Sequence, residues 1–310
     1  MTSPSTPNRL PIDPKHVALQ FARRGDLADA QFLYAEIAQR MDQRLKLIRL
    51  QPTDILDAGC GAGQQLGLLH ARYPSACYQG LDHCDALLAK AQQRARQQWP
   101  RRMPNWLCKL LGRKAPAQWI HADLAQTTLP PESLDLVWSN LSLHWHPAPH
   151  DVLQEWGRVL RPNGLVFFSC FGPATLKELR SALHDAKLHT RTPDFVDMHD
   201  FGDLLVEKGF SDPVMDQEVL TLTYETPEKL LADVRVLGGN AAIGRHAGLV
   251  GRGWRSRLLQ ALEAQRQPDG RLHLTIEVAY GHAWRSALRR TPTGETRISV
   301  SAIGRKSAKE

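Results

Sequence analysis

The stretch Ile55–Gly63 reads ILDAGCGAG, in which glycine recurs at every second position once the apolar residues end. Glycine is less favourable than alanine inside regular structure by roughly 0.5–1 kcal/mol, so this spacing indicates a backbone that turns tightly and leaves room for a ligand. Ile55–Ala58 has the apolar pattern of a short buried strand, and residues 64–72 have the pattern of a helix. The stretch therefore predicts a strand, a glycine turn and a helix.

Strand patterns and helical patterns alternate on both sides of this stretch. Strands are expected over 76–81, 117–121, 134–139 and 164–170, and helices over 31–47, 86–98 and 152–160. After residue 172 the rhythm changes, with helices expected over 175–183, 201–208 and 227–236 and strands over 218–224 and 272–280. Strands that alternate with helices indicate βαβ units and a mostly parallel sheet, which is an α/β fold.

The chain reads as a single domain with additions. The first 20 residues are polar, rich in proline and without the apolar core of a secretory signal, so 1–20 is expected to be a disordered lead. The insertion at 99–116 has many cations and no acid, which suits either a mobile flap or docking surface, or a solvated loop. The domain is expected over 21–300, with an N-terminal helix, this basic insertion, helical elaborations at 173–215 and 226–265, and a basic tail at 301–310.

Composition and charge restrict the class of protein. With 42% hydrophobic and 23% charged residues, the chain is an ordinary globular protein, and no run approaches the ~20 apolar residues of a membrane span. Five cysteines without a C-x-x-C pair suggest neither a zinc site nor a disulfide framework, and we expect a cytoplasmic protein. The net charge of +7 favours nucleic acid, an anionic membrane surface or an acidic protein as partner, or reflects a merely solvated surface.

The glycine turn is expected to hold a cationic ligand. In an open parallel sheet, ligands sit outside the carboxyl ends of the strands, near the first turn from strand to helix. Gln64 stands where the dinucleotide fingerprint G-x-G-x-x-G requires glycine. Asp57 would oppose a phosphate at this position and would suit a ligand that carries an amine and a sulfonium. The turn therefore favours S-adenosylmethionine over a nicotinamide or flavin nucleotide.

Acidic residues also follow the next two strands. Asp82, with His83 beside it, comes about 20 residues after the glycines, where an acid receives ribose hydroxyls, although an acid here also caps an ordinary turn. Asp123 and Leu124 follow the third strand, where a carboxylate can accept from the adenine amino group while leucine packs against the base. Three acids at the ends of three consecutive strands, after a glycine turn, together indicate one binding site.

These segments resemble the ordered motifs of class I S-adenosylmethionine-dependent methyltransferases over roughly residues 50–172. The motifs are ILDAGCGAG, GLD at 80–82, HADL at 121–124, SLDLVWSNLSLHW at 133–145 and RVLRPNGLVFF at 158–168. The resemblance implies a Rossmann-like, doubly wound, seven-stranded and mostly parallel sheet whose last strand is antiparallel. It implies a cofactor site in which Asp57, Gly59, Gly61 and Gly63 surround the methionine part, Asp82 binds the ribose, Asp123 and Leu124 bind the adenine, and Asn140 lies beside the methyl group.

The segment after the fourth strand bears on the methyl acceptor. It reads SNLSLHWHPAPH and has neither the N-P-P-Y or D-P-P-Y of amine-modifying enzymes nor the cysteine of pyrimidine C5 enzymes. SNL with Trp145, E-x-x-R-V-L-R-P at 155–162 and FGPATLKELRSA at 171–182 are similar to the malonyl-[acyl-carrier protein] O-methyltransferases of biotin synthesis. This resemblance implies an acidic carrier protein bearing a malonyl thioester as partner. Its carboxylate is already ionised, so no strong general base is required.

Four residues are candidates for positioning the acceptor: Asn140, His144, Trp145 and Arg180. A guanidinium grips carboxylates bidentately, so Arg180 is either the carboxylate clamp or a surface arginine on a helix. Trp145 is either a wall of the acceptor pocket or a buried core residue. The nearby histidines lack a carboxylate or cysteine at a known metal spacing, so no metal is expected.

Two other functions stay open at this stage. The MHD-x-G-D-L-L segment at 198–205 and EVAYGHAW at 277–284 also resemble arginine hydroxylases of respiratory complex I assembly, which bind the same cofactor and act on a protein. The positive charge prompts an RNA methyltransferase, but no appended RNA-binding motif supports a nucleic-acid partner. The cofactor is therefore predicted more directly than the acceptor.

Overall fold

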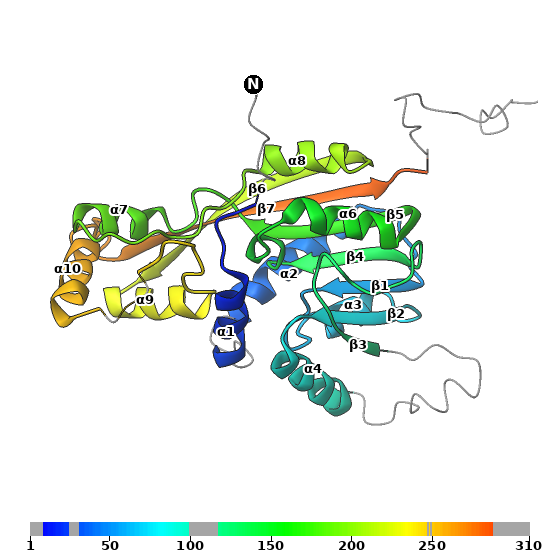
Figure 1. Cartoon of the computed structure of the whole chain (residues 1–310), viewed down its shortest axis with the longest axis horizontal. Coiled ribbons are helices and arrows are strands. Elements are labelled where there is room, and N and C mark those ends of the chain that lie inside the picture. The colour runs from blue at the N-terminus through cyan, green and yellow to red at the C-terminus, as the bar shows by residue number, and fades with distance from the viewer. Residues whose placement is uncertain (1–8, 25–30, 99–116, 247, 249, 288–310) are drawn as a thin grey trace, which may run out of the picture.

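One seven-stranded sheet, in the order β3-β2-β1-β4-β5-β7-β6, runs through the molecule (Figure 1). The computed structural model describes residues 9–24, 31–98, 117–246, 248 and 250–287. The predicted insertion at 99–116 and the predicted tail at 301–310 lie outside the described residues. The strands are β1 Asp54–Ala58, β2 Cys77–Asp82, β3 Ala117–His121, β4 Leu134–Asn140, β5 Leu160–Phe171, β6 Phe210–Tyr224 and β7 Leu272–Arg285.

Strands β1 to β5 are parallel to one another, whereas β7 is antiparallel to both β5 and β6. The predicted Rossmann-like, mostly parallel sheet with an antiparallel last strand is therefore confirmed. The helices are α1 Pro14–Arg24, α2 Gln31–Leu45, α3 Leu66–Arg72, α4 Asp85–Gln98, α6 Pro149–Val159, α7 Lys177–Asp185, α8 Met198–Glu207, α9 Pro227–Val236 and α10 Arg252–Glu263, with a short 3-10 helix at Leu143–Trp145. No helix among the described residues is long and apolar enough to cross a membrane.

Both faces of the central strands are buried. Successive residues of a strand point to opposite faces, and Ile55 and Leu56 belong to two different apolar clusters. Helices α2 and α3 cover one face, and α6 and α8 cover the other. The continuous apolar runs of these strands follow from this burial, because a parallel sheet covered on both sides has no polar face.

Residues 9–20, the part of the expected disordered lead over 1–20 that the structure describes, form an ordered segment. Helix α1 begins within it at Pro14, and Ile12 and Val17 are only 1% and 4% exposed. Asp13 accepts a hydrogen bond from the His16 amide and pairs with Arg245 at 3.2 Å. Ile12 also forms a β-bridge with Ala242. The segment is ordered by contacts with residues far along the chain, which a local pattern does not reveal.

Burial of α6 against the sheet predicts a large effect of one substitution. Trp156 is 0% exposed within the cluster that joins α6, α8 and the sheet. Trp156→Ala is expected to lower the free energy of unfolding by about 3–5 kcal/mol, because the surrounding residues cannot fill the space of the indole. Val219→Ala on β6 is the control, since Val219 is 57% exposed and the change should stay within about 0.5 kcal/mol. Urea denaturation measures both, and equal losses would contradict this packing.

Candidate active site

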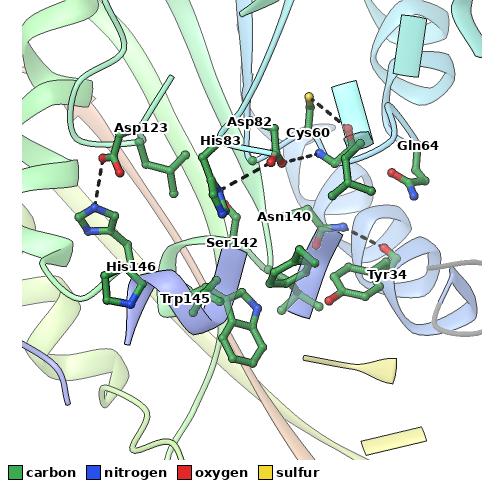
Figure 2. A pocket seen from close by; sticks show the side chains of 18 of the residues that line it. Tyr34, Cys60, Gln64, Asp82, His83, Asp123, Asn140, Ser142, Trp145 and His146 are labelled. Carbon is green, nitrogen blue, oxygen red and sulfur yellow. Dashed lines mark hydrogen bonds and ion pairs between the residues drawn. The ribbon is translucent and has the colours of Figure 1, made fainter. Parts of the chain in front are cut away.

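A cavity opens at the carboxyl ends of β1, β2 and β4. Its free volume, including its open mouth, is about 1000 Å³. The glycine turn after β1 and the turn after β2 form one side, and the 3-10 helix, α1 and α2 supply the rest of the wall. In Figure 2, Asp123 and His146 lie on one side of the cavity, Asn140 and Tyr34 on the other, and Asp82 and His83 between them.

The glycine turn needs glycine for two different reasons. Gly59 has φ +79°, and a Cβ there would lie 2.3 Å from the Cβ of Ser142. The hydroxyl of Ser142 is fixed in this place, because it donates a hydrogen bond to the carbonyl of Ala58 at 2.9 Å. Gly61 has φ +53° and lines the cavity, and the nearest atom to an added Cβ would be a side-chain oxygen of Gln64 at 3.4 Å. A branched side chain at Gly61 would therefore be strained and would enter the cavity.

Asp82 fixes this turn. Its Oδ2 accepts the amide of Gly61 at 2.9 Å, and its Oδ1 accepts the amide of Cys84 at 2.9 Å. Burial raises the pKa of Asp82, while the charge of His83 and the amide donors lower it. These amides do not use all of the about four lone-pair sites of a carboxylate, so acceptor capacity remains for a ligand in the cavity that Asp82 lines.

Asp57 lies beneath the turn. Its side chain is 1% exposed, and its Oδ2 accepts the hydroxyl of Tyr78 at 2.6 Å, whereas its buried Oδ1 has no partner among the described residues. Burial raises the pKa of Asp57 to about 7, and the Tyr78 hydrogen bond limits that rise. Asp57 is not among the residues that line the cavity. Asp57 therefore lies behind the wall of the cavity, in contact with Tyr78 of β2.

Asp123 is paired with His146, a residue whose role the sequence did not reveal. His146 Nε2 donates to Asp123 Oδ1 at 3.1 Å, and the amide of Ala148 donates to His146 Nδ1 at 3.1 Å. The second bond leaves the ring proton on Nε2, so the imidazole faces Asp123 as a donor. The His146 hydrogen bond lowers the pKa of Asp123, which keeps this carboxylate ionised at the cavity edge beside Leu124.

The amide of Asn140 joins three elements. Its Nδ2 donates to the carbonyl of Tyr34 on α2 at 2.9 Å, and its Oδ1 accepts the hydroxyl of Ser169 on β5 at 2.9 Å. The next residue, Leu141, has φ +53°, which is unusual for a side chain of this kind. Asn140 lines the cavity, with its amide held in a fixed orientation by Tyr34 and Ser169.

His144 and Trp145 have different surroundings. His144 is 1% exposed, lies outside the cavity lining and packs against Phe171 and Phe195, with ring centroids 4.5 and 5.5 Å away. Burial lowers the pKa of His144 to about 3, so its ring is neutral. Trp145 lines the cavity, and it fits there because Gly238 has no Cβ, which would lie 1.9 Å from the indole.

Arg180 is the site candidate that the structure separates from the others. Its guanidinium donates to the carbonyls of Pro173 and Thr175, each at 2.5 Å. It lines a second depression beyond α7 and is absent from the cavity lining. Of the two alternatives from the sequence, this position agrees with an arginine at the surface of a helix, because the side chain turns back to carbonyls of its own loop.

Apart from Arg180, the predicted residues fall into two groups. Those that line the cavity together are Gly59, Gly61, Asp82, His83, Asp123, Leu124, Asn140 and Trp145. Asp57, Gly63 and His144 lie behind its wall, with Gly63 facing Trp119. Sequence reasoning missed the contributions of α1 and α2, namely Pro14, Val17, Phe21 and Tyr34. The apolar spacing over 31–47 predicted a helix there, but no motif marked α1 or α2 as part of a site.

Comparisons with known proteins agree with this geometry. Residues 56–168 match the methyltransferase domain family. The YcgJ protein of Bacillus subtilis shares the fold with a TM-score of 0.54 at 11% identity, covering 81% of this chain and 99% of that one. The fold, the cavity and the domain match define a class I S-adenosylmethionine-dependent methyltransferase.

The relatives narrow the class to one family. The malonyl-[acyl-carrier protein] O-methyltransferase of Laribacter hongkongensis (strain HLHK9) is 44% identical over 89% of this chain and 91% of its own length. The protein of the same name from Gallionella capsiferriformans (strain ES-2) is 40% identical over 95% of this chain and 98% of its own length. The chain belongs to the malonyl-[acyl-carrier protein] O-methyltransferase family.

The buried carboxyl of Asp57 predicts a pH-dependent stability. Its pKa is about 7 when folded and near 3.8 when exposed, so the folded state binds the proton more tightly. The resulting stabilisation is complete below about pH 4 and is lost as the pH rises to about 7. Asp57→Asn removes the titrating group and keeps an oxygen for Tyr78, so the variant should gain stability relative to the wild type between pH 5 and pH 8. Urea denaturation at both pH values measures this, and an identical pH dependence would contradict it.

Proposed function

We propose that the chain esterifies the free carboxylate of a malonyl group carried on an acyl carrier protein, a step of biotin synthesis. The observation that carries this proposal is the extent of the similarity, which includes the elaborations after residue 172 as well as the motifs around the cavity. Such a carrier-bound substrate places the reaction in the cytoplasm. The two alternatives from the sequence, a protein hydroxylase and an RNA methyltransferase, have no comparable support.

The cavity has features that suit the methyl donor. We propose that Gly59 and Gly61 leave room for its methionine part, and that Asp82 receives the ribose hydroxyls with the acceptor positions left free by the two amides. We propose that Asp123 accepts from the adenine amino group while Leu124 packs against the base. Asp57 and His83 would act from beneath and beside the turn. An acidic floor suits a cation and disfavours a pyrophosphate.

The proposed reaction requires positioning more than proton transfer. The bound donor supplies an electrophilic methyl group on a positively charged sulfur. An oxygen of the malonyl carboxylate forms the new O–CH3 bond as the S–CH3 bond breaks, and the electron pair goes to sulfur, so no proton moves. The chain contributes alignment and exclusion of water. The apolar wall of Phe21, Leu141 and Trp145 and the fixed amide of Asn140 supply these.

The cavity wall is consistent with a carboxylate acceptor. Neither lysine nor arginine is among the described residues that line it. A carboxylate that enters would therefore be neutralised chiefly by the sulfonium of the donor, which draws the two reacting groups together. An amine acceptor would have to lose a proton first. His146, an imidazole in the cavity lining with a fixed tautomer, is engaged with Asp123.

Methyl transfer tests the proposed function directly. The full-length protein is incubated with donor labelled in the methyl group and with malonyl-loaded carrier protein. Label is expected on the carrier as a base-labile ester, in equal amount to the demethylated donor released. Acetyl-loaded carrier protein is the control, because it lacks the free carboxylate and should take up no label.

Other outcomes of the same assay would overturn the proposal. Donor binding without transfer to the malonyl carrier would favour the hydroxylase alternative. Label on RNA, with retention that falls steeply as salt increases, would favour the RNA methyltransferase. Equal labelling of the acetyl and malonyl carriers would show that the carboxylate is not the acceptor.

Substitutions of two glycines, Gly61 and Gly67, test the proposed position of the donor. Gly61→Val is expected to abolish donor binding, because the side chain would be strained at φ +53° and would enter the cavity. Gly67→Val on α3 is the matched control, since no atom lies within 4 Å of a Cβ there and the backbone is helical. Calorimetric titration with the donor measures affinity, and thermal denaturation shows that both variants fold. Undiminished binding by Gly61→Val would remove the turn from the donor site.

A further inference from the structure

A second depression lies beyond the end of α7 and is rich in cations. We name it the basic groove. Its charged and imidazole side chains come from α7, the loop after it and the segment before α8, and they are Arg180, His184, Lys187, His189, Arg191 and Asp194. Gly244 closes one side. In Figure 1, α7 lies at the end of the molecule formed with α9 and α10, well away from β3.

The cations of the basic groove are available to a partner. Lys187 and Arg191 are exposed, and neither forms an ion pair with an acidic side chain in the described part of the chain. The acids nearby are few: Asp194 lines the groove, and Asp185 is paired with His184 at 3.3 Å. Lys187 also has φ +51°, a left-handed conformation that normally selects glycine. Backbone stability alone would favour glycine at this position, yet the chain has a lysine there.

The segment 238–246 joins the basic groove to the cavity. On the groove side, Asn240 donates to the carbonyl of Arg191 at 2.6 Å, and the Arg191 amide donates to the carbonyl of Gly244 at 3.5 Å. On the cavity side, Gly238 and Ala241 pack against Trp145. One segment of nine residues therefore contacts both the basic groove and the wall of the cavity.

The surface beside the groove also offers apolar contact. Ile243, the neighbour of Gly244 in the chain, is 56% exposed. The amide of Ile243 donates to the carbonyl of Pro11 at 2.7 Å, which fixes the residue on the segment that contacts both groove and cavity. Unpaired cations near an exposed aliphatic side chain are complementary to an acidic helix that presents a few apolar residues.

We propose that the basic groove is the docking surface for the acidic carrier protein that delivers the thioester, with Lys187 and Arg191 as its principal contacts. This inference rests on the proposed function for the identity of the partner. Carrier proteins of this kind are acidic, which matches the charge of the groove, and the segment 238–246 connects the groove to the cavity wall. Arg180, whose guanidinium is tied to two backbone carbonyls, adds positive charge and shapes the groove.

A charge reversal tests the docking surface. The double variant Lys187→Glu, Arg191→Glu is compared with Lys46→Glu, Arg49→Glu, which changes the net charge equally. Lys46 and Arg49 are exposed and precede β1, at the edge of the sheet opposite the cavity. The side chain of Lys46 lies 3.9 Å from Asp42 at the surface, a contact of little energetic value. Binding of holo carrier protein is measured by fluorescence anisotropy, and kcat/KM is measured with the malonyl carrier.

The groove variant is expected to lose about tenfold or more in carrier affinity and in kcat/KM at low ionic strength. The loss should shrink as salt is raised, since exposed charges are screened. Affinity for the methyl donor should be unchanged. The control variant should stay close to the wild type.

The outcomes separate this inference from the proposed function. Equal losses in both variants, or no carrier binding by the wild type, would overturn the docking surface. Carrier binding that depends on Lys187 and Arg191, without methyl transfer to the malonyl group, would leave the docking surface standing and overturn the proposed reaction. Binding of RNA in place of the carrier, weakened by the same reversal, would assign the groove to a different partner and overturn the inference.

Discussion

The carboxylate of Asp82 connects the two turns from which the cavity is built. By accepting the amides of Gly61 and Cys84, it ties the turn after β1 to the turn after β2. Parallel pairing of the two strands brings these turns to the same edge of the sheet, but pairing alone does not fix the path of a glycine-rich loop. Burial raises the pKa of Asp82, and the amide donors counteract that rise because they favour the charged form. The same two bonds therefore shape the loop and maintain negative charge beside it.

Asp57 adds a second acid below the first. The charge of Asp82 contributes to the raised pKa of Asp57, so the two carboxyl groups oppose each other's ionisation. A cationic ligand above the turn relieves this opposition, whereas a phosphate would increase it. Preference for a sulfonium donor would follow from this buried pair, of which only Asp82 lines the cavity. The sequence predicted both acids beside the turn, but it could not show that Asp57 lies beneath it.

Local patterns predicted the sheet and the residues at the ends of its strands. The glycine turn, Asp82, Asp123 and Asn140 could be found in this way because each lies at or just after the carboxyl end of a predicted strand. What the patterns did not reveal depends on distant contacts. Ile12, just before helix α1, pairs with Ala242, and His146 bonds to Asp123 only because the chain returns to that strand end. The side chain of Arg180 turns to carbonyls of its own loop, which the spacing of a helix does not reveal.

The elements after β5 form the basic groove, the second surface to which we assign a partner. Strands β1 to β5 and the turns between them contain every group that we assign to the donor, and such groups suit any acceptor that reaches the methyl. Selection of the acceptor must then come from what surrounds the cavity mouth. Here the surroundings are α1, which lines the cavity, and the segment 238–246, which bonds to residues 11–13 just before α1 on one side and to the loop of Arg191 on the other. The same segment packs against Trp145 in the cavity wall. The surface proposed for a large partner and the wall that encloses a small reacting group therefore share one segment of the chain.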